Sequence, residues 1–186
     1  MADRHLSAGR TQWGRRQFLK VAGAAAVLIP CGGALASGAE RRTLKFVHTH
    51  TGEKLSACYA AGGSYQSQCL LQVNRFLRDF RTGEIHPIDP ALLDVLYDLQ
   101  VAADRDDTFE VISAYRSPRT NSLLRSQSSG VAEHSLHMDG KAIDIRLTGV
   151  PTKKVRDLAL SLRRGGVGFY ASSDFVHVDT GRVRSW

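Results

Sequence analysis

The segment Glu133-His-Ser-Leu-His-Met-Asp-Gly-Lys-Ala-Ile-Asp-Ile-Arg146 joins a polar turn to an alternating strand. Successive side chains of an extended chain point to opposite faces, so the two isoleucines share one face and Asp144 lies on the other. Gly140 permits a tight turn that folds His137 back toward Asp144. The segment therefore predicts a strand with one buried apolar face and one polar face beside an imidazole.

A second strand of the same kind follows near the end of the sequence. In Phe175-Val-His-Val-Asp179 the two valines face one way, and His177 and Asp179 face the other. Two polar-faced strands that each offer an imidazole or a carboxylate can converge on one ion. Two histidines and one carboxylate, with a fourth position open to water, are what a catalytic zinc site needs.

The order of the other expected elements indicates the fold class. Residues 43–50 and 54–59 flank Thr51-Gly52-Glu53 as a hairpin, and Asp89-Pro90 supplies a helix cap and a first-turn proline. Further strands are expected over 109–114, 142–147, 167–170 and 175–179, and helices over 65–81, 89–103, 121–126 and 152–164. Two early helices followed by mixed strands predict an α+β domain on one antiparallel sheet.

The positive charge is concentrated near the N-terminus. The chain has 186 residues and a net charge of +7, of which the first 36 residues, with five basic groups and one acidic group, contribute +4. This distribution argues against nucleic acid as a partner. Hydrophobic content of 42% and charged content of 23% exclude a disordered, collagenous or multi-span chain. The following 150 residues suit one domain.

The N-terminal segment has the features of an export signal. Arg15-Arg16-Gln-Phe-Leu-Lys20 precedes the apolar stretch 21–29, and Ala34-Leu-Ala36 offers a cleavage site. We expect a twin-arginine-type signal peptide over 1–36, a linker over 37–43 and the functional domain over 44–186. The apolar stretch falls short of the ~20 residues of a membrane span, so the alternative of a membrane anchor is disfavoured. The mature chain is expected in the periplasm or cell envelope, as a monomer without a membrane span.

Two cysteines remain after the expected cleavage. Cys58 and Cys69 have ten residues between them, and in an oxidising compartment such a pair predicts a disulfide. Closing this loop would stabilise the fold by roughly 3 kcal/mol in the chain-entropy treatment.

An ordered set of motifs resembles one family. Ser135-x-His137-x-x-Gly140-x-Ala142-x-Asp144, followed by His177, resembles the zinc peptidases grouped with lysostaphin, D-Ala-D-Ala peptidases and hedgehog domains. Four further motifs resemble the YcbK/MepK-type murein endopeptidases: His48-Thr-His-Thr-Gly-Glu53, Asn74-Arg-Phe-Leu-Arg-Asp79, Ser113-Ala-Tyr-Arg-Ser117 and Phe175-Val-His-Val-Asp-Thr-Gly181. The similarity covers 44–186 and implies a hedgehog/DD-peptidase-like single domain, with helices packed on one antiparallel sheet.

The resemblance also implies roles for individual residues. His137, Asp144 and His177 would bind Zn²⁺, which lowers the pKa of a bound water from 15.7 to about 7 and polarises the scissile carbonyl. Arg116 matches the arginine of the family's S-x-Y-R motif and would stabilise the oxyanion or hold a substrate carboxylate. The alternative for Arg116 is a structural ion pair.

The general base has two candidates. Some relatives place a glutamate three residues before the last ligand, and others place a histidine two residues before it. These positions hold Asp174 and Phe175 here. Asp174 is a carboxylate one methylene shorter than glutamate, and Asp179 is its rival because it shares a strand face with His177. Both stay open as catalytic residues.

Three other histidines have competing interpretations. His48 and His50 share a strand face and could chelate a metal, but no third ligand is close in sequence, which favours packing or surface roles. His134 precedes His137 by three residues and is either a cleft residue or a loop histidine.

Together these features predict a zinc-dependent peptidase that hydrolyses peptide cross-links in bacterial peptidoglycan, with metal-activated water as nucleophile. Its partners would be peptidoglycan peptide stems. Two alternatives remain: a hedgehog-like cell-wall binding module that keeps the metal without cleavage, and a peptidoglycan carboxypeptidase.

Overall fold

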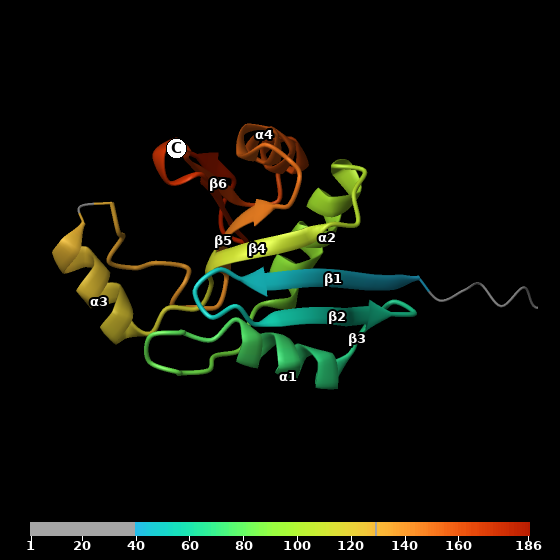
Figure 1. Ribbon diagram of the computed structural model, residues 1–186, viewed down its shortest axis with the longest axis horizontal. Coiled ribbons are helices and arrows are strands. Elements are labelled where there is room, and N and C mark those ends of the chain that lie inside the picture. Colours follow the sequence, from blue (N-terminus) through green and yellow to red (C-terminus); the bar gives the residue numbers. More distant parts are fainter. Residues whose placement is uncertain (1–39, 129) are drawn as a thin grey trace, which may run out of the picture. The chain divides into compact units, whose positions relative to one another are not determined.

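Eight strands form one mixed sheet in the order β3-β2-β1-β4-β5-β7-β6-β8 (Figure 1). The computed structural model describes residues 40–128 and 130–186, so the expected signal peptide lies outside the described residues. The strands are β1 Arg41–His48, β2 Lys54–Ala61, β3 Ser64–Tyr65, β4 Thr108–Ser113, β5 Ala142–Leu147, β6 Gly166–Tyr170, β7 Phe175–Asp179 and β8 Arg184–Ser185. The α-helices are α1 Ser67–Phe76, α2 Pro90–Ala102, α3 Pro118–Gln127 and α4 Thr152–Leu162.

The predicted α+β architecture on a single sheet is confirmed, and the sheet is mixed. Most neighbouring strands pair antiparallel, whereas β1 pairs with β4 and β6 pairs with β8 in parallel. The chain between β1 and β4 includes a hairpin and two helices. It is therefore long enough for β4 to return beside β1 in the same direction.

Several element boundaries differ from the expected ones. The strand β1 begins at Arg41 and so extends into the expected linker. The first helix is shorter than expected because Tyr65 pairs with Ala60 as part of β3. The helix α3 is longer than expected, since the Ser117 hydroxyl accepts the backbone N–H of Thr120 and caps its start.

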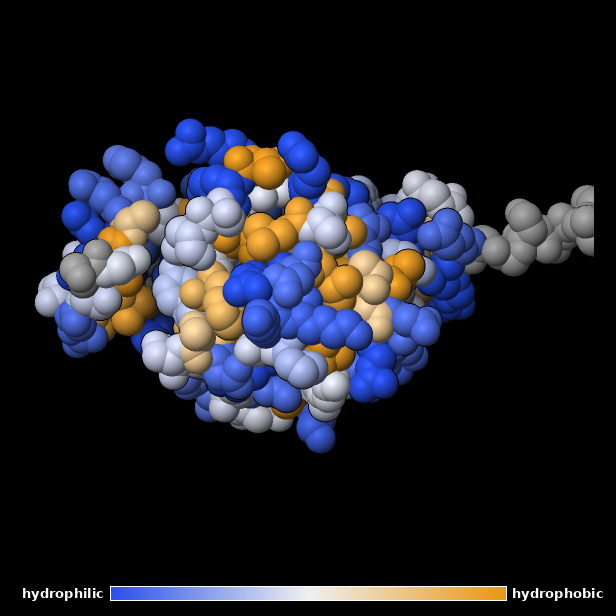
Figure 2. All heavy atoms as spheres, turned by 90° about the horizontal axis from the view of Figure 1, so that it is seen from above, coloured by the Kyte–Doolittle hydropathy of each residue, from blue (hydrophilic) through white to orange (hydrophobic). Residues whose placement is uncertain are grey.

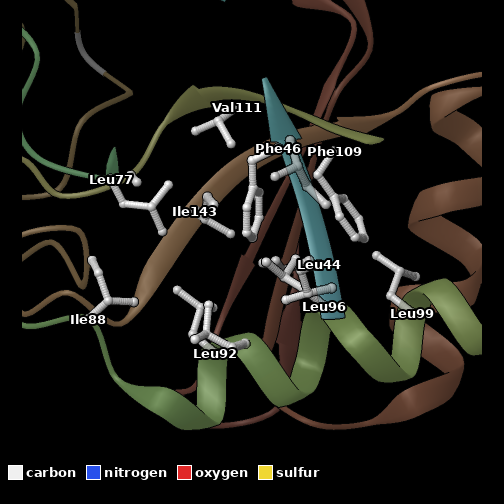
Figure 3. Close-up of a cluster of buried hydrophobic side chains, with 14 of the residues drawn as sticks. Leu44, Phe46, Leu77, Ile88, Leu92, Leu96, Leu99, Phe109, Val111 and Ile143 are labelled. Atoms are coloured by element: carbon white, nitrogen blue, oxygen red, sulfur yellow. The ribbon is translucent and has the colours of Figure 1, made fainter. Parts of the chain in front are cut away.

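Three helices cover one face of the sheet. Figure 3 shows Leu92, Leu96 and Leu99 of α2 facing Phe46 of β1 and Phe109 of β4. The same buried cluster includes residues of α1 and α4 and the inward side chains of β5 and β7. The side chains that alternate with these core positions lie on the opposite face of the sheet. The polar side chains of β5 and β7 are on that face.

The predicted disulfide is not formed. Cys58 and Cys69 are both free and half-buried in the structure. The Cys58 thiol, on β2, lies 3.6 Å from the carbonyl oxygen of Ala60 on its own strand. Burial, together with the nearby Cys58 sulfur, raises the pKa of the Cys69 thiol, so the Cys69 sulfur remains protonated near neutral pH.

Exposed apolar side chains are distributed among polar ones. On the face drawn in Figure 2, hydrophobic residues are interspersed with hydrophilic ones and form no unbroken belt. Within residues 40–128 and 130–186, no helix has the length and hydropathy required to cross a membrane.

Candidate metal centre

The two polar-faced strands lie next to each other in the sheet. The strands β5 and β7 pair antiparallel, with Asp144 directly opposite His177. Both side chains are buried on the face opposite the helices. The strand period therefore places a carboxylate and an imidazole of two distant chain segments in contact, 2.9 Å apart between Asp144 Oδ1 and His177 Nδ1.

His137 reaches the same point from the turn before β5. Its Nδ1 lies 2.6 Å from the carbonyl oxygen of Ala114. A carbonyl only accepts, so Nδ1 carries the proton and Nε2 is left with a lone pair. Gly140 closes the turn with φ +66, and a Cβ there would lie 2.2 Å from the carbonyl oxygen of Pro87. Only glycine combines that backbone conformation with that close approach.

The tautomer of His177 follows from Asp179. The His177 Nε2 lies 3.1 Å from Asp179 Oδ2, and a carboxylate accepts, so the proton belongs on Nε2. The lone pair of His177 is then on Nδ1, which faces His137 and Asp144. A carboxylate that fixes a ligating histidine in this way is typical of metal sites.

Three lone-pair atoms meet at one point. His177 Nδ1 lies 3.2 Å from His137 Nε2 and 2.9 Å from Asp144 Oδ1, and the last two atoms are 3.3 Å apart. Ligand atoms at roughly 2.0–2.1 Å from a tetrahedral zinc are about 3.3 Å from one another. The three side chains form the one group in residues 40–128 and 130–186 that could hold a metal ion in this way, and their donor set fits zinc.

The electrostatics of the group favour a cation. Burial lowers the pKa of His137, which keeps that imidazole neutral and available as a ligand. Burial opposes the charged form of His177 as well, but hydrogen bonds to Asp144 and Asp179 outweigh it and raise the pKa of His177. Burial likewise opposes ionisation of Asp144, yet the two imidazoles hold its pKa well below the usual range. The anionic ligand is therefore retained at any moderate pH.

Asp179 is placed to orient His177. Its side chain is fully buried. Besides His177, it accepts the backbone N–H groups of Gly166 and Gly181 and two N–H groups of Arg184. Both oxygens are thus engaged, and Asp179 is absent from the residues that line the cleft. These contacts favour an orienting role for Asp179, and its role as a base stays a prediction.

Asp174 lies outside the metal centre. It adopts φ +51 in the turn before β7, and this left-handed conformation turns its exposed side chain away from the ligands. Its Oδ1 accepts the Thr152 hydroxyl at 2.6 Å, and its Oδ2 lies 3.5 Å from Arg146 Nε. It lines a different pocket from the ligands. The structure therefore does not bring Asp174 together with the three candidate ligands, and its role as a base stays a prediction.

Arg116 lies against a metal ligand. One Nη donates to Asp144 Oδ2 at 2.5 Å, and its Nε donates to Ser113 Oγ at 3.0 Å. The ion pair that was the alternative interpretation is therefore present, and it steadies the carboxylate of Asp144. Arg116 also lines the cleft, and its guanidinium has five N–H donors, more than these two bonds use.

The three ligands lie in a cleft of about 430 Å³. His134 lines this cleft, which decides between its two interpretations. The lining residues that the sequence reasoning missed include Tyr170, Arg184 and Trp186. The pair Gly166 and Gly168 signals that another group approaches this face of β6 closely, but it does not identify which residues do so.

His48 and His50 take no part in the centre. His48 is buried and packs edge-on against Phe80, with ring centroids 5.1 Å apart, and His50 stacks on Phe80 with ring centroids 4.4 Å apart. The packing role is therefore confirmed for both.

The buried His48 predicts a pH dependence of stability. Burial is the main cause that lowers its pKa, so the unfolded chain binds a proton that the folded chain resists. The free energy of unfolding should therefore fall as pH drops through the ordinary histidine range, about pH 6.5. The charged or titratable groups that act on it are His50, Glu53, Arg78 and Arg81. Urea unfolding at neutral and mildly acidic pH should show a smaller loss for His48→Phe than for the wild type, and equal losses would contradict this account.

The chain is similar to known proteins over most of its length. The family model described as peptidoglycan L,D-endopeptidase MepK matches residues 36–186. The chain belongs to the MepK family. A probable peptidoglycan L,D-endopeptidase MepK of Haemophilus influenzae is 44% identical over 154 residues, which cover 82% of this chain and 83% of that protein. The peptidoglycan L,D-endopeptidase MepK of Escherichia coli K12 is 41% identical over 175 residues, covering 92% and 96%. No solved structure matches the chain.

Proposed function

We propose that this member of the MepK family is a zinc-dependent endopeptidase that hydrolyses peptide cross-links in peptidoglycan. The carrying observation is the triangle of His137 Nε2, Asp144 Oδ1 and His177 Nδ1 in an open cleft. The names of the relatives, all peptidoglycan L,D-endopeptidases, support the substrate and favour an L,D bond.

The side chains of the centre would hold the metal ion and keep one another in position. A bound zinc ion would supply Lewis-acid polarisation of the scissile carbonyl and acidify a water. His137 and His177 hold their ligating nitrogens unprotonated through the Ala114 carbonyl and Asp179. Arg116 keeps the Asp144 carboxylate in place. These contacts preorganise the ligands before the substrate arrives, so little reorganisation is needed during the reaction.

The charge of the cleft suits an anionic peptide stem. Arg116 and Arg184 both line it. Among the described residues, Asp144 supplies the one carboxylate side chain in its lining. Arg116 retains N–H donors beyond those bound to Asp144 and Ser113. We assign these donors to a carboxylate of the stem peptide, since a guanidinium binds carboxylates in a planar, directional manner.

We also propose that the protein acts outside the cytoplasm. Export by a twin-arginine-type signal over 1–36 would deliver the domain to the periplasm or envelope, where peptidoglycan is found. The chain is proposed to act there as a monomer. A fractionation of cells that express the full chain should find the processed protein outside the cytoplasm, and retention in the cytoplasm would contradict the proposed location.

Digestion of purified sacculi tests the activity. The zinc-loaded protein should convert cross-linked muropeptide dimers to monomers, as followed by mass spectrometry, and a chelator should stop the conversion. If only terminal residues of free stems disappear, the protein is a carboxypeptidase. If it binds sacculi and releases no fragments, it is a binding module. Either result would contradict the proposal.

A further inference from the structure

An aromatic wall stands beside the metal ligands. It comprises Tyr170 of β6, Phe175 of β7 and Trp186 after β8, all of which line the cleft. Tyr170 stacks on Phe175, with ring centroids 4.5 Å apart. The Trp186 ring centroid lies 5.2 Å from that of His177. The wall is therefore continuous with the ligand set, although neither Tyr170 nor Trp186 is a metal ligand.

Trp186 is held in a fixed position. Its backbone N–H donates to the carbonyl oxygen of Val167, and its own carbonyl accepts the N–H of Phe169. Figure 1 shows the C-terminal segment beside β6, consistent with these bonds. The guanidinium of Arg184 lies 4.9 Å from the indole centroid. The indole thus has backbone, hydrogen-bond and cation–π restraints.

Gly168 makes room for this indole. It pairs with His177 across β6 and β7, so it lies beside the ligand on the same face. A Cβ at this position would approach the Trp186 ring to 2.6 Å. An alanine would therefore push the indole away from the sheet, and because Trp186 is about half exposed, the ring could move without unfolding the strand.

The indole sets the direction of the Tyr170 hydroxyl. Trp186 Nε1 donates to the Tyr170 oxygen at 3.0 Å, and an indole N–H only donates. The phenolic oxygen is thus an acceptor in this contact, and its own hydrogen must point elsewhere. Among the described residues, no hydrogen bond takes that hydrogen. Tyr170 lines the cleft, so this donor is available to a group bound beside it.

Arg116, the expected oxyanion donor, has two of its N–H groups engaged, and its remaining N–H groups are assigned above to a substrate carboxylate. Arg116 uses Nε and one Nη to hold Ser113 and Asp144. When water adds to the peptide carbonyl, the π pair moves to the carbonyl oxygen, which becomes an oxyanion. Collapse re-forms the carbonyl and breaks the C–N bond, and a proton from the water ends on the departing amine. An O–H donor on a residue that lines the cleft suits the charge that develops on that oxygen.

We infer that Tyr170 is a catalytic residue that donates its hydroxyl hydrogen to the oxyanion of the scissile carbonyl, with Trp186 as the residue that positions it. This inference rests on the proposed peptidase function. It assigns Tyr170 a bond that strengthens in the transition state, so its loss should lower kcat and leave KM little changed.

The test compares Tyr170→Phe with the wild type on a purified cross-linked muropeptide dimer. The phenylalanine keeps the stack on Phe175 and removes only the hydroxyl. We expect kcat to fall about 100-fold with KM within about threefold. Zinc content should be unchanged. Affinity for a phosphinate peptide, which imitates the tetrahedral oxyanion, should fall by a similar factor. Tyr97→Phe, which removes a hydroxyl on α2, is the matched control and should behave as wild type.

Two further variants test the role of the indole. Trp186→Phe removes the N–H and Gly168→Ala displaces the ring, and each should lower kcat about tenfold while zinc stays bound. The inference is overturned if the wild type cleaves the dimer and Tyr170→Phe does so within about threefold of it. A wild type that leaves the dimer intact overturns the proposed function, and this role with it.

Discussion

Replacing His137 with alanine is expected to remove zinc binding and peptidase activity together. The imidazole supplies one of three ligand atoms, and its Nε2 lies 3.2 and 3.3 Å from the other two. Loss of an outer partner of a ligand already weakens metal affinity by about 10–100-fold, so loss of a ligand should weaken it by more than about 100-fold. Isothermal titration of the metal-free variant with zinc measures this directly, and muropeptide release measures activity.

A second readout separates metal loss from misfolding. Zinc that binds only the folded chain raises its melting temperature. The wild type should therefore melt higher with zinc than without it, whereas His137→Ala should melt at one temperature in both conditions. His50→Ala is the control, because His50 is an exposed imidazole outside the centre. If His137→Ala keeps zinc at wild-type affinity, His137 is not a ligand.

The second large effect is expected at Asp179. Asp179→Asn removes the negative charge that holds the proton on His177 Nε2 and that also pairs with Arg184. Zinc affinity should fall about 10–100-fold because His177 is no longer fixed in its ligating tautomer. Asp174→Asn is the matched change, an identical substitution in an exposed turn, and should leave both zinc affinity and turnover within about threefold of the wild type.

The same pair of variants decides the general base. An Asp174→Asn protein that binds zinc normally and loses activity more than about 100-fold would restore Asp174 to the chemistry. An Asp179→Asn protein with normal zinc affinity and no activity would do the same for Asp179. Direct zinc titration beside the muropeptide assay distinguishes these outcomes from the expected one.

The local parts of the centre could be predicted because strand periodicity is local. The bounds of β5 and β7 match the expected 142–147 and 175–179, since strict alternation of apolar and polar residues leaves one choice of face. The direct pairing of Asp144 with His177 could not be obtained in this way. It depends on which strands become neighbours, and sheet order is set by the packing of the whole domain.

The candidate bases and the cleft residues were harder to predict from the sequence, because the spacing of residues along the chain does not determine the direction in which a side chain points. Asp174 has the spacing of a family base, but a left-handed turn carries it to another pocket. Asp179 has the right face, but five hydrogen bonds from its neighbours and His177 occupy it. Trp186 was missed because its indole occupies space that a side chain at position 168 would fill. A glycine in a strand does not identify the residue that occupies that space.

Titration of the metal-free protein with zinc, with cleavage of cross-linked muropeptide dimers followed in the same samples, tests the central claim most directly. The account predicts no cleavage without metal, and a rate that rises in proportion to bound zinc and levels off at one ion per chain. Full cleavage by the metal-free protein, or saturation with zinc at the three ligands without any cleavage, would contradict it.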